Sequence, residues 1–134
     1  MPCNIIPTLK YVDAAAAIDW LCRAFGFQRH LVVEGESGTI EHAQLILDDG
    51  MVMLGSVRDS EFDKLQKPPS VTSEFVSQSP YIVVEDVDAH CARAITAGAR
   101  IVMEPSDQDY GGRLYSCKDP EGHLWNFGWY NPWR

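Results

Sequence analysis

The chain has 134 residues, of which 46% are hydrophobic and 22% are charged, the composition of one ordinary globular domain. Its 19 acidic residues outnumber its 11 basic residues and give a net charge of -8. An acidic surface repels phosphate backbones and anionic lipid, and no apolar run approaches the roughly 20 residues of a membrane span. We therefore expect neither nucleic acid nor a membrane as a partner.

The opening residues and the cysteines indicate a compartment. The stretch Met1-Pro2-Cys3-Asn4 has neither the basic nor the apolar region of a signal peptide. The four cysteines lie far apart and none belongs to a CxxC pair, which favours free thiols in a reducing environment. We therefore expect a cytoplasmic protein.

The first part of the chain reads as a strand, a helix and three further strands. Residues 4–12 form a strand-like run in which Pro7 favours an edge position. Asp13 is a typical helix cap, and Gly26 ends the alanine-rich helix that follows. Three strand-like runs come next, at residues 27–34, 39–47 and 51–57.

Residues 58–78 are polar, contain a Pro-Pro pair and show no hydrophobic period, so we expect a linker or a mobile flap. The earlier pattern then restarts. A strand over 80–85 precedes a helix that begins near Asp86 and ends before Gly98. The remaining strands are expected at residues 100–104, 113–118 and 123–129, the last two forming a hairpin around Asp-Pro-Glu-Gly.

The order β-α-β-β-β therefore occurs twice, and the repeat is the organising feature of the chain. Asp13 and Asp86 are 73 residues apart, and Gly26 and Gly98 are 72 apart. We expect an α+β fold in which two βαβββ modules form a curved mixed sheet around a cleft. A single domain over 1–134 would then consist of a first module at 3–57, a linker at 58–78 and a second module at 79–130.

The two repeats also resemble a known family. The stretches YVDAAAAIDWLCRAFGF and VEDVDAHCARAITAGARIV, with the later YGGRLYSCKDPEGHLWNF, resemble the vicinal oxygen chelate superfamily of glyoxalases, bleomycin-resistance proteins and dioxygenases. The resemblance covers nearly the whole chain and is strongest in the second half. Within the superfamily, it points to the small bleomycin-resistance-like or PhnB-like branch.

The resemblance implies a divalent metal held between the modules, with ligands on the first and last strand of each. Counting back from the acidic residue near the start of each helix places the first-strand positions at Ile6 and Ser79, and the last-strand positions fall at Met53 and Asn126. The family's usual His, Gln and Glu are absent from these positions, and only Gln78 nearby is a weak donor. We therefore expect no metal and no cofactor.

Other polar residues are candidates for contact with a ligand. His42 and Gln44 alternate with Ala43 and Leu45, so the two polar side chains share one strand face. If the apolar pair faces the helix, His42 and Gln44 face the cleft. The alternative is that they are solvated or paired with each other.

The Asp-Pro-Glu-Gly turn suggests a register for the last hairpin in which Tyr115 lies opposite Asn126. We expect both side chains to point into the cleft, with Arg113 further along, while Trp125 and Phe127 pack under the helix. His90 is expected on an exposed helix face, and His123 to bond locally in the turn.

Aromatic residues near the end of the chain complete the candidate set. Tyr110 precedes a pair of glycines, and Trp129 opens a segment that either walls the cleft or seals a dimer interface. The expected ligand-binding residues are His42, Gln44, Tyr110, Arg113, Tyr115, Asn126 and Trp129, with no catalytic residue among them.

Three functions fit these observations. The first is a non-catalytic binder, like the bleomycin-resistance branch, that sequesters a planar aromatic drug or antibiotic in a cleft completed by a homodimer. The second is a metal-dependent glyoxalase-type lyase, an isomerase or a dioxygenase. The third is a structural or regulatory module with a vestigial cleft. The residues at the four metal positions favour the first.

Overall fold

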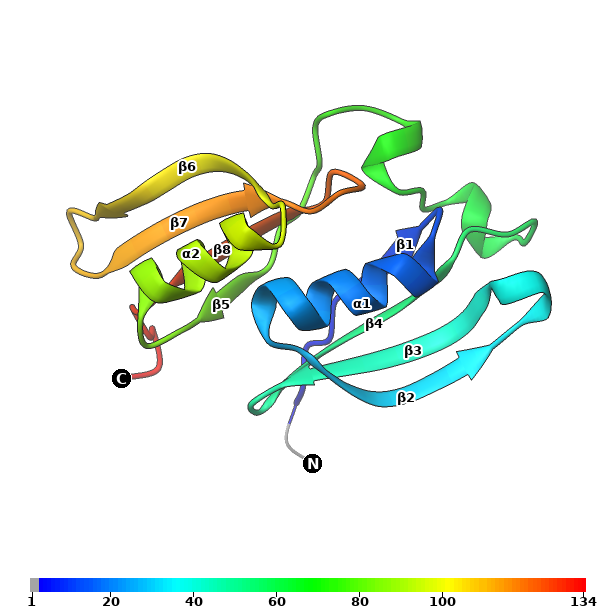
Figure 1. The fold of residues 1–134 in the computed structure, drawn as a ribbon, viewed down its shortest axis with the longest axis horizontal. Helices are drawn as coiled ribbons and strands as arrows, with labels where there is room; N and C mark the ends of the chain where they lie inside the picture. The colour runs from blue at the N-terminus through cyan, green and yellow to red at the C-terminus, as the bar shows by residue number, and fades with distance from the viewer. Residues whose placement is uncertain (1–2) are drawn as a thin grey trace.

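The computed structural model describes residues 3–134; Met1 and Pro2, the first half of the stretch Met1-Pro2-Cys3-Asn4 that lacks the pattern of a signal peptide, lie outside it. The chain forms two four-stranded mixed sheets, each with one helix, and both helices lie on the same side of the molecule (Figure 1). In chain order the elements are β1 (Thr8–Tyr11), α1 (Ala14–Phe25), β2 (Gln28–Glu34), β3 (Ile40–Leu47), β4 (Gly50–Ser56), β5 (Tyr81–Val83), α2 (Val87–Thr96), β6 (Arg100–Asp107), β7 (Arg113–Lys118) and β8 (Leu124–Gly128).

Both sheets have the same strand order, which confirms the expected α+β fold of two βαβββ units. Sheet A runs β1-β4-β3-β2 and sheet B runs β5-β8-β7-β6. In each sheet the first strand is parallel to the last, and the other neighbours are antiparallel. No helix within the described residues is long and apolar enough to cross a bilayer.

The helices begin and end as their sequences predict. Asp13 Oδ1 accepts a 3.1 Å hydrogen bond from the Ala16 amide, and Asp86 Oδ1 accepts one of 3.0 Å from Ala89. Gly26 and Gly98 follow the two helices at φ values of 90° and 94°, which only glycine adopts without strain.

Each sheet buries one face under its helix. In sheet A the buried side chains are Ala43, Leu45, Val52 and Leu54, and in sheet B they are Tyr115, Cys117, Trp125 and Phe127. We call the opposite face of each sheet its open face. Because side chains alternate along a strand, the residues between these core positions point to the open faces.

The repeat is visible in the hydrogen bonding of the backbone. The Met53 amide donates to the Pro7 carbonyl at 3.0 Å, and the Asn126 amide donates to the Pro80 carbonyl at 3.1 Å. Each pair is shifted by 73 residues from its counterpart, the same shift that relates Asp13 to Asp86. Met53 and Asn126 are therefore equivalent positions in the two modules.

The helices also exchange equivalent contacts. Trp20 Nε1 donates to the Ala97 carbonyl just beyond α2, at 2.7 Å. Arg93, again 73 residues later, donates through Nε to the Arg23 carbonyl at 2.8 Å and through a second nitrogen to the Cys22 carbonyl at 3.2 Å. Each helix thus supplies a side-chain donor for carbonyls at the end of the other helix.

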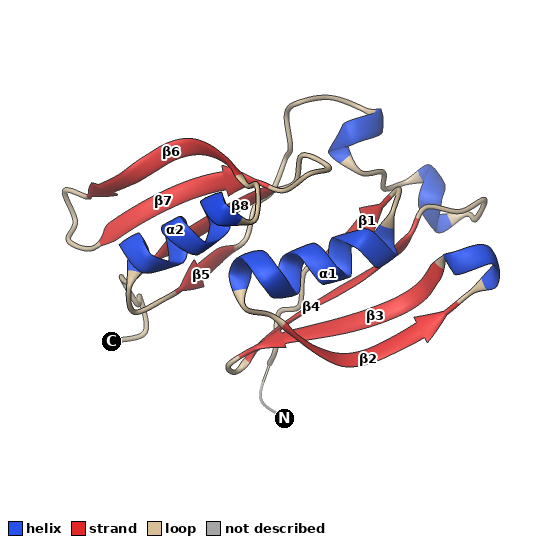
Figure 2. Cartoon of the chain, viewed as in Figure 1, coloured by secondary structure: helices blue, strands red, loops and turns tan. Residues whose placement is uncertain are grey.

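The segment between the modules is more ordered than its sequence suggests. It arches from β4 to β5 and contains two short helical turns, Phe62–Lys64 and Pro69–Val71 (Figure 2). Lys10 Nζ forms a 3.0 Å ion pair with Asp63, whose side chain is only 6% exposed. Gln66 Nε2 donates to the Thr8 carbonyl at 2.8 Å. These contacts hold the segment against the first strand.

Candidate functional site

The expected register of the last hairpin is wrong by one residue. Ser116, not Tyr115, pairs with Asn126, and Tyr115 pairs with Phe127. The turn is one residue shorter than expected: the Asp119 amide donates to the His123 carbonyl, so Asp119 rather than Lys118 lies opposite His123. A slip of one residue reverses the face of every side chain in a strand.

Tyr115 consequently lies in the core and not in a cleft. Its side chain is fully buried beneath α2, and burial raises the pKa of its hydroxyl well above the usual value. The hydroxyl lies 2.6 Å from His90 Nδ1, while His90 Nε2 donates to the Phe25 carbonyl at 3.1 Å. The expectation of an exposed His90 was also wrong, because the ring joins the two modules.

Arg113 shares the helix-side face of β7 with Tyr115. Its Nε donates to Asp88 near the start of α2, and its Nη1 donates to Asp107 on the neighbouring strand, both at 3.1 Å. These bonds fix the guanidinium at the edge of sheet B. The expectation that Arg113 points into the cleft was therefore wrong.

His42 and Gln44 occupy the open face of sheet A, as predicted. Gln44 Nε2 donates to His42 Nε2 at 3.1 Å, so the hydrogen-bonding groups of the pair are partly satisfied internally. His42 lies opposite Val33, and Gln44 lies opposite Met53. Among the described residues, no hydrogen bond or ion pair joins this pair to sheet B.

Asn126 faces the open side of sheet B, as predicted, but its amide is heavily committed. Its Oδ1 accepts a 2.7 Å bond from the Ser116 hydroxyl. Its Nδ2 donates to Ser79 Oγ at 2.8 Å and to the Pro80 carbonyl at 3.0 Å. Asn126 therefore joins the start of β5 to β8 and β7.

Tyr110 and Trp129 lie apart from these groups, at the end of the second module. The ring of Tyr110 makes an edge contact with Tyr130, with centroids 5.2 Å apart, and the Trp129 amide donates to the Arg113 carbonyl at 3.2 Å. Both side chains are more than half exposed. The structure thus pairs Tyr110 with Tyr130 and leaves the exposed Trp129 side chain beside Tyr130 in the chain.

A large groove lies where the two modules meet. It encloses about 800 Å³ between residues 5–9, residues of the 65–80 segment and the ring of His123. We call it the junction groove. Ile6 and Ser79, the two first-strand positions of the resemblance, both line it. Apart from its length and its prolines, nothing in the sequence of the 65–80 segment indicated that it would line this groove.

The residues at the four inherited metal positions do not fit a divalent ion. Ile6 has no donor, Met53 offers a weak thioether, and the Ser79 hydroxyl and Asn126 amide bond to each other. Within residues 3–134, no three His, Cys, Asp or Glu side chains come together in a metal-like group. The polar character of this region is that of hydrogen-bonding hydroxyl and amide groups.

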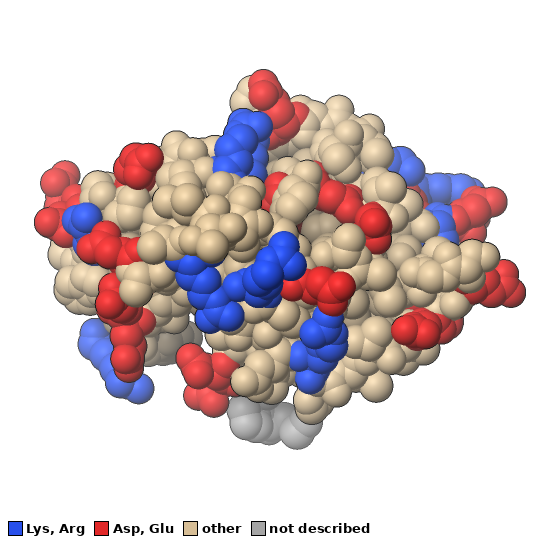
Figure 3. All heavy atoms as spheres, viewed as in Figure 1, with Lys and Arg blue, Asp and Glu red and all other residues tan. Residues whose placement is uncertain are grey.

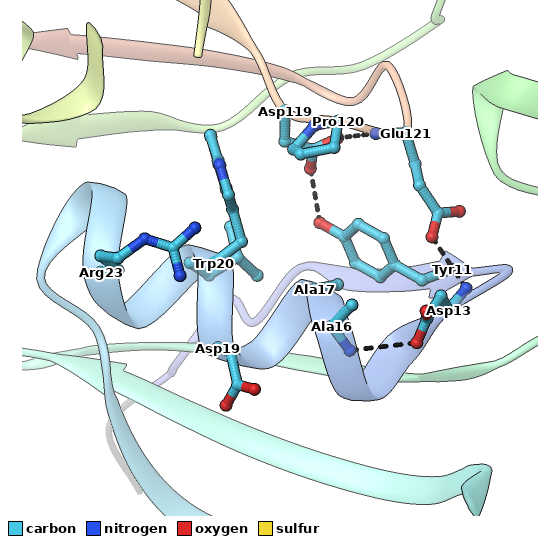
Figure 4. Close-up of a pocket in the computed structure, with 11 residues that line it drawn as sticks. Tyr11, Asp13, Ala16, Ala17, Asp19, Trp20, Arg23, Asp119, Pro120 and Glu121 are labelled. Carbon is cyan, nitrogen blue, oxygen red and sulfur yellow. Dashed lines mark hydrogen bonds between the residues drawn. The ribbon is translucent and has the colours of Figure 1, made fainter. Parts of the chain in front are cut away.

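A second pocket, which we call the outer pocket, lies on the helix side between α1 and the Asp119–Glu121 turn (Figure 4). It has a volume of about 480 Å³, and Trp20 and Tyr11 form part of its wall. Glu121 accepts bonds of 2.6 and 2.8 Å from the amides of Val12 and Asp13. The Glu121 carboxylate therefore holds the second module against the first.

Comparisons with known proteins agree with this architecture. The chain is 34% identical over 125 residues to the uncharacterized protein Mb0911c of Mycobacterium bovis, covering 91% of this chain and 80% of that protein. It is 34% identical to TioX from Micromonospora sp. ML1, whose crystal structure superposes with a TM-score of 0.72 over 95% of this chain and 98% of TioX.

A more distant likeness shows the fold alone. The fosfomycin resistance protein FosX from Mesorhizobium loti is 13% identical, with a TM-score of 0.68 over 98% of this chain and 95% of FosX.

The family model described as Glyoxalase/Bleomycin resistance protein/Dioxygenase superfamily matches residues 8–127. The chain belongs to the Glyoxalase/Bleomycin resistance protein/Dioxygenase superfamily.

Proposed function

We propose that this protein binds an amphipathic, planar small molecule in the junction groove, without a metal and without chemical turnover. The observation that carries the proposal is the combination of a groove of about 800 Å³ with the residues at the four inherited ligand positions. The volume is in the range of ordinary small-molecule sites. Ile6, Met53, Ser79 and Asn126 supply no imidazole and no carboxylate.

The groove suits a ligand with a large apolar surface. Leu65 and Phe75 line it although they are 83% and 79% exposed, so a bound planar molecule would remove their side chains from water. Sequestration of a drug or antibiotic is a function that such binding alone supplies, because a molecule held in the groove is withheld from its target.

The protein is proposed to act as a homodimer. Leu31 and Val33 on the open face of sheet A are 44% and 39% exposed, and Tyr81 and Val83 on that of sheet B are 39% and 41% exposed. Apolar side chains spread over both open faces favour burial against a second copy. Light scattering is expected to give twice the mass of one chain, and a monomer at micromolar concentration would contradict this part.

The binding proposal is tested with fluorenone, a neutral planar ketone, by equilibrium dialysis of EDTA-treated protein. We expect saturable binding of one molecule per chain. Ile6→Trp places a large ring in the groove and should weaken binding at least tenfold. Ile95→Trp is the matched control, since Ile95 is 54% exposed on α2, outside the groove. Equal loss in both variants, or no saturation in the unmodified chain, contradicts the proposal.

The same preparation separates the binder from a metal-dependent lyase, isomerase or dioxygenase. Addition of Ni²⁺, Zn²⁺ or Mn²⁺ is expected to leave the affinity for fluorenone unchanged and to leave no tightly held ion after dialysis. Near-stoichiometric metal that survives dialysis would instead support the enzyme.

A further inference from the structure

The junction groove differs from the rest of the protein in its charge. Acidic side chains are scattered over the helix-bearing side (Figure 3), and four of the residues lining the outer pocket are acidic. None of the 17 residues that line the junction groove is acidic, and one, Lys67, is basic. In a chain of net charge -8, this absence leaves the groove without a partner for a cationic ligand.

Ser116, Asn126 and Ser79 are linked by hydrogen bonds beside the start of β5, and the donor and the acceptor of each bond can be assigned. The Pro80 carbonyl can only accept, so the nitrogen of the Asn126 amide faces Pro80 and Ser79. The amide oxygen then faces Ser116, whose hydroxyl donates to it. Both protons of the nitrogen are then used, one on Ser79 Oγ and one on the Pro80 carbonyl.

Ser79 is consequently left as a donor. Its oxygen already accepts the proton of Asn126, and none of the hydrogen bonds within residues 3–134 uses its own hydroxyl proton. Ser79 lines the groove, and a hydroxyl that accepts one hydrogen bond becomes a better donor in a second. Asn126 does not itself offer a proton to a ligand.

From these observations, we infer that the ligand of the junction groove carries a hydrogen-bond acceptor, a carbonyl or carboxylate oxygen, that receives the proton of Ser79, and that the ligand is neutral or anionic. Asn126 and Ser116 act as positioning residues that aim this proton. The inference rests on the proposed function, and it names the chemical class of the ligand.

The test compares fluorenone with fluorene, a planar hydrocarbon of the same ring framework that lacks the carbonyl. The quantity measured is the ratio of the two dissociation constants, because the contribution of the shared apolar surface cancels in it. Ser79→Ala is expected to reduce the preference for fluorenone about fivefold, the effect of one hydrogen bond, while the affinity for fluorene changes little.

Two further variants separate the positioning role from a structural one. Asn126→Asp replaces the donor facing Ser79 with an acceptor that takes the serine proton, so it should reduce the preference as much as Ser79→Ala does. Ser70→Ala, at an exposed serine outside the groove, should leave the ratio unchanged. Thermal melting checks that each variant is folded. If Asn126→Asp does not fold, the result for Ser79→Ala alone decides whether Ser79 donates to the ligand.

A planar cation, proflavine, completes the series and should bind at least tenfold more weakly than fluorenone. If both fluorenone and fluorene bind but Ser79→Ala leaves the ratio of their dissociation constants unchanged, the inference is overturned. The proposed function is not contradicted by that result. Tighter binding of proflavine in the groove, lost in Ile6→Trp, also overturns it. Failure of every probe to bind contradicts the proposed function itself.

Discussion

The hydroxyl of Tyr11 donates a 2.7 Å hydrogen bond to Asp119 Oδ2, although the two residues are 108 positions apart in the chain. Trp125 Nε1 donates to the same oxygen at 3.1 Å, and the amides of Glu121 and His123 donate to Oδ1. One buried carboxylate therefore organises its own turn and fastens the second module to the first strand. Burial and the adjacent Asp119 charge raise the pKa of Tyr11 well above its usual value.

Tyr11→Phe should therefore destabilise the whole domain. The substitution keeps the ring but leaves a buried carboxylate oxygen with one partner fewer, and hydrogen bonds to charged groups contribute about 2 kcal/mol. We expect the free energy of unfolding in urea to fall by about that amount. Tyr110→Phe removes an exposed hydroxyl and is the control; equal losses in the two variants would show that the buried bond has no special weight.

Glu121 provides a second contact between the modules, as a cap on the start of α1. Both of its oxygens accept backbone amides from the other module, so Glu121→Ala should cost about 1 kcal/mol and speed hydrogen exchange at Val12 and Asp13. Glu85→Ala, at an exposed glutamate, should have no such effect. Unchanged exchange at the two amides would remove the capping role.

His90 should make stability fall as the pH is lowered below the ordinary histidine pKa of 6.5. Burial between the modules lowers its pKa below the ordinary 6.5, and the nearby Arg93 charge acts in the same direction, against the hydrogen bond to the Phe25 carbonyl. The unfolded chain therefore binds the proton more readily than the folded chain. Stability is fully present above pH 6.5 and falls as the pH is lowered from there toward the folded pKa.

The measurement is the free energy of unfolding at pH 7.5 and pH 5 in the unmodified chain and in His90→Gln. The glutamine amide can still donate to the Phe25 carbonyl but does not titrate. The decrease between the two pH values should be smaller in the variant, and an identical decrease would assign the effect to other groups.

Asp63 should make the stability depend on pH in a separate range, more acidic than that of His90. Burial alone would raise its pKa, but the Arg58 amide, the Ser60 hydroxyl and Lys10 together hold it at about 2. The stability that this carboxylate contributes is present above the ordinary value of 3.8 and is lost as the pH falls toward 2. Asp63→Asn should cost about 1 to 2 kcal/mol at pH 7 and loosen the segment joining the modules.

Limited proteolysis within residues 58–78 measures that loosening, and faster cleavage is the expected result. Asp59→Asn is the control, because Asp59 is an exposed carboxylate in the same segment. If cleavage is equally fast in both variants, the Lys10–Asp63 pair does not hold the segment.

Local signals in the sequence predicted the modules well. The ends of both helices could be predicted because capping acts within one helical turn. The positions of Asp13, Asp86 and the terminal glycines therefore indicated the helix boundaries without information on the rest of the fold. The 73-residue shift between Asp13 and Asp86 predicted that the second module repeats the elements of the first. Alternation alone placed His42 and Gln44 on the open face of sheet A.

The contacts between modules were beyond the reach of such signals. Tyr115 was misplaced because the turn after Asp119 contains one residue fewer than the expected hairpin loop, and that length depends on hydrogen bonds to Asp119. His90 was misplaced because its partners, Tyr115 and Phe25, come from distant parts of the chain. Asn126 was placed on the correct face, but its commitment to Ser79 and Ser116 follows only from the folded arrangement.

The central claim is that a small planar molecule binds in the junction groove. Its most direct test is a two-dimensional amide NMR titration of the EDTA-treated protein with fluorenone. We expect saturable shifts confined to the amides of the non-proline residues of 5–9 and of the 65–80 segment, and to that of His123. Shifts centred on α1 and the Asp119–Glu121 turn, or no saturable shift at all, would contradict the claim.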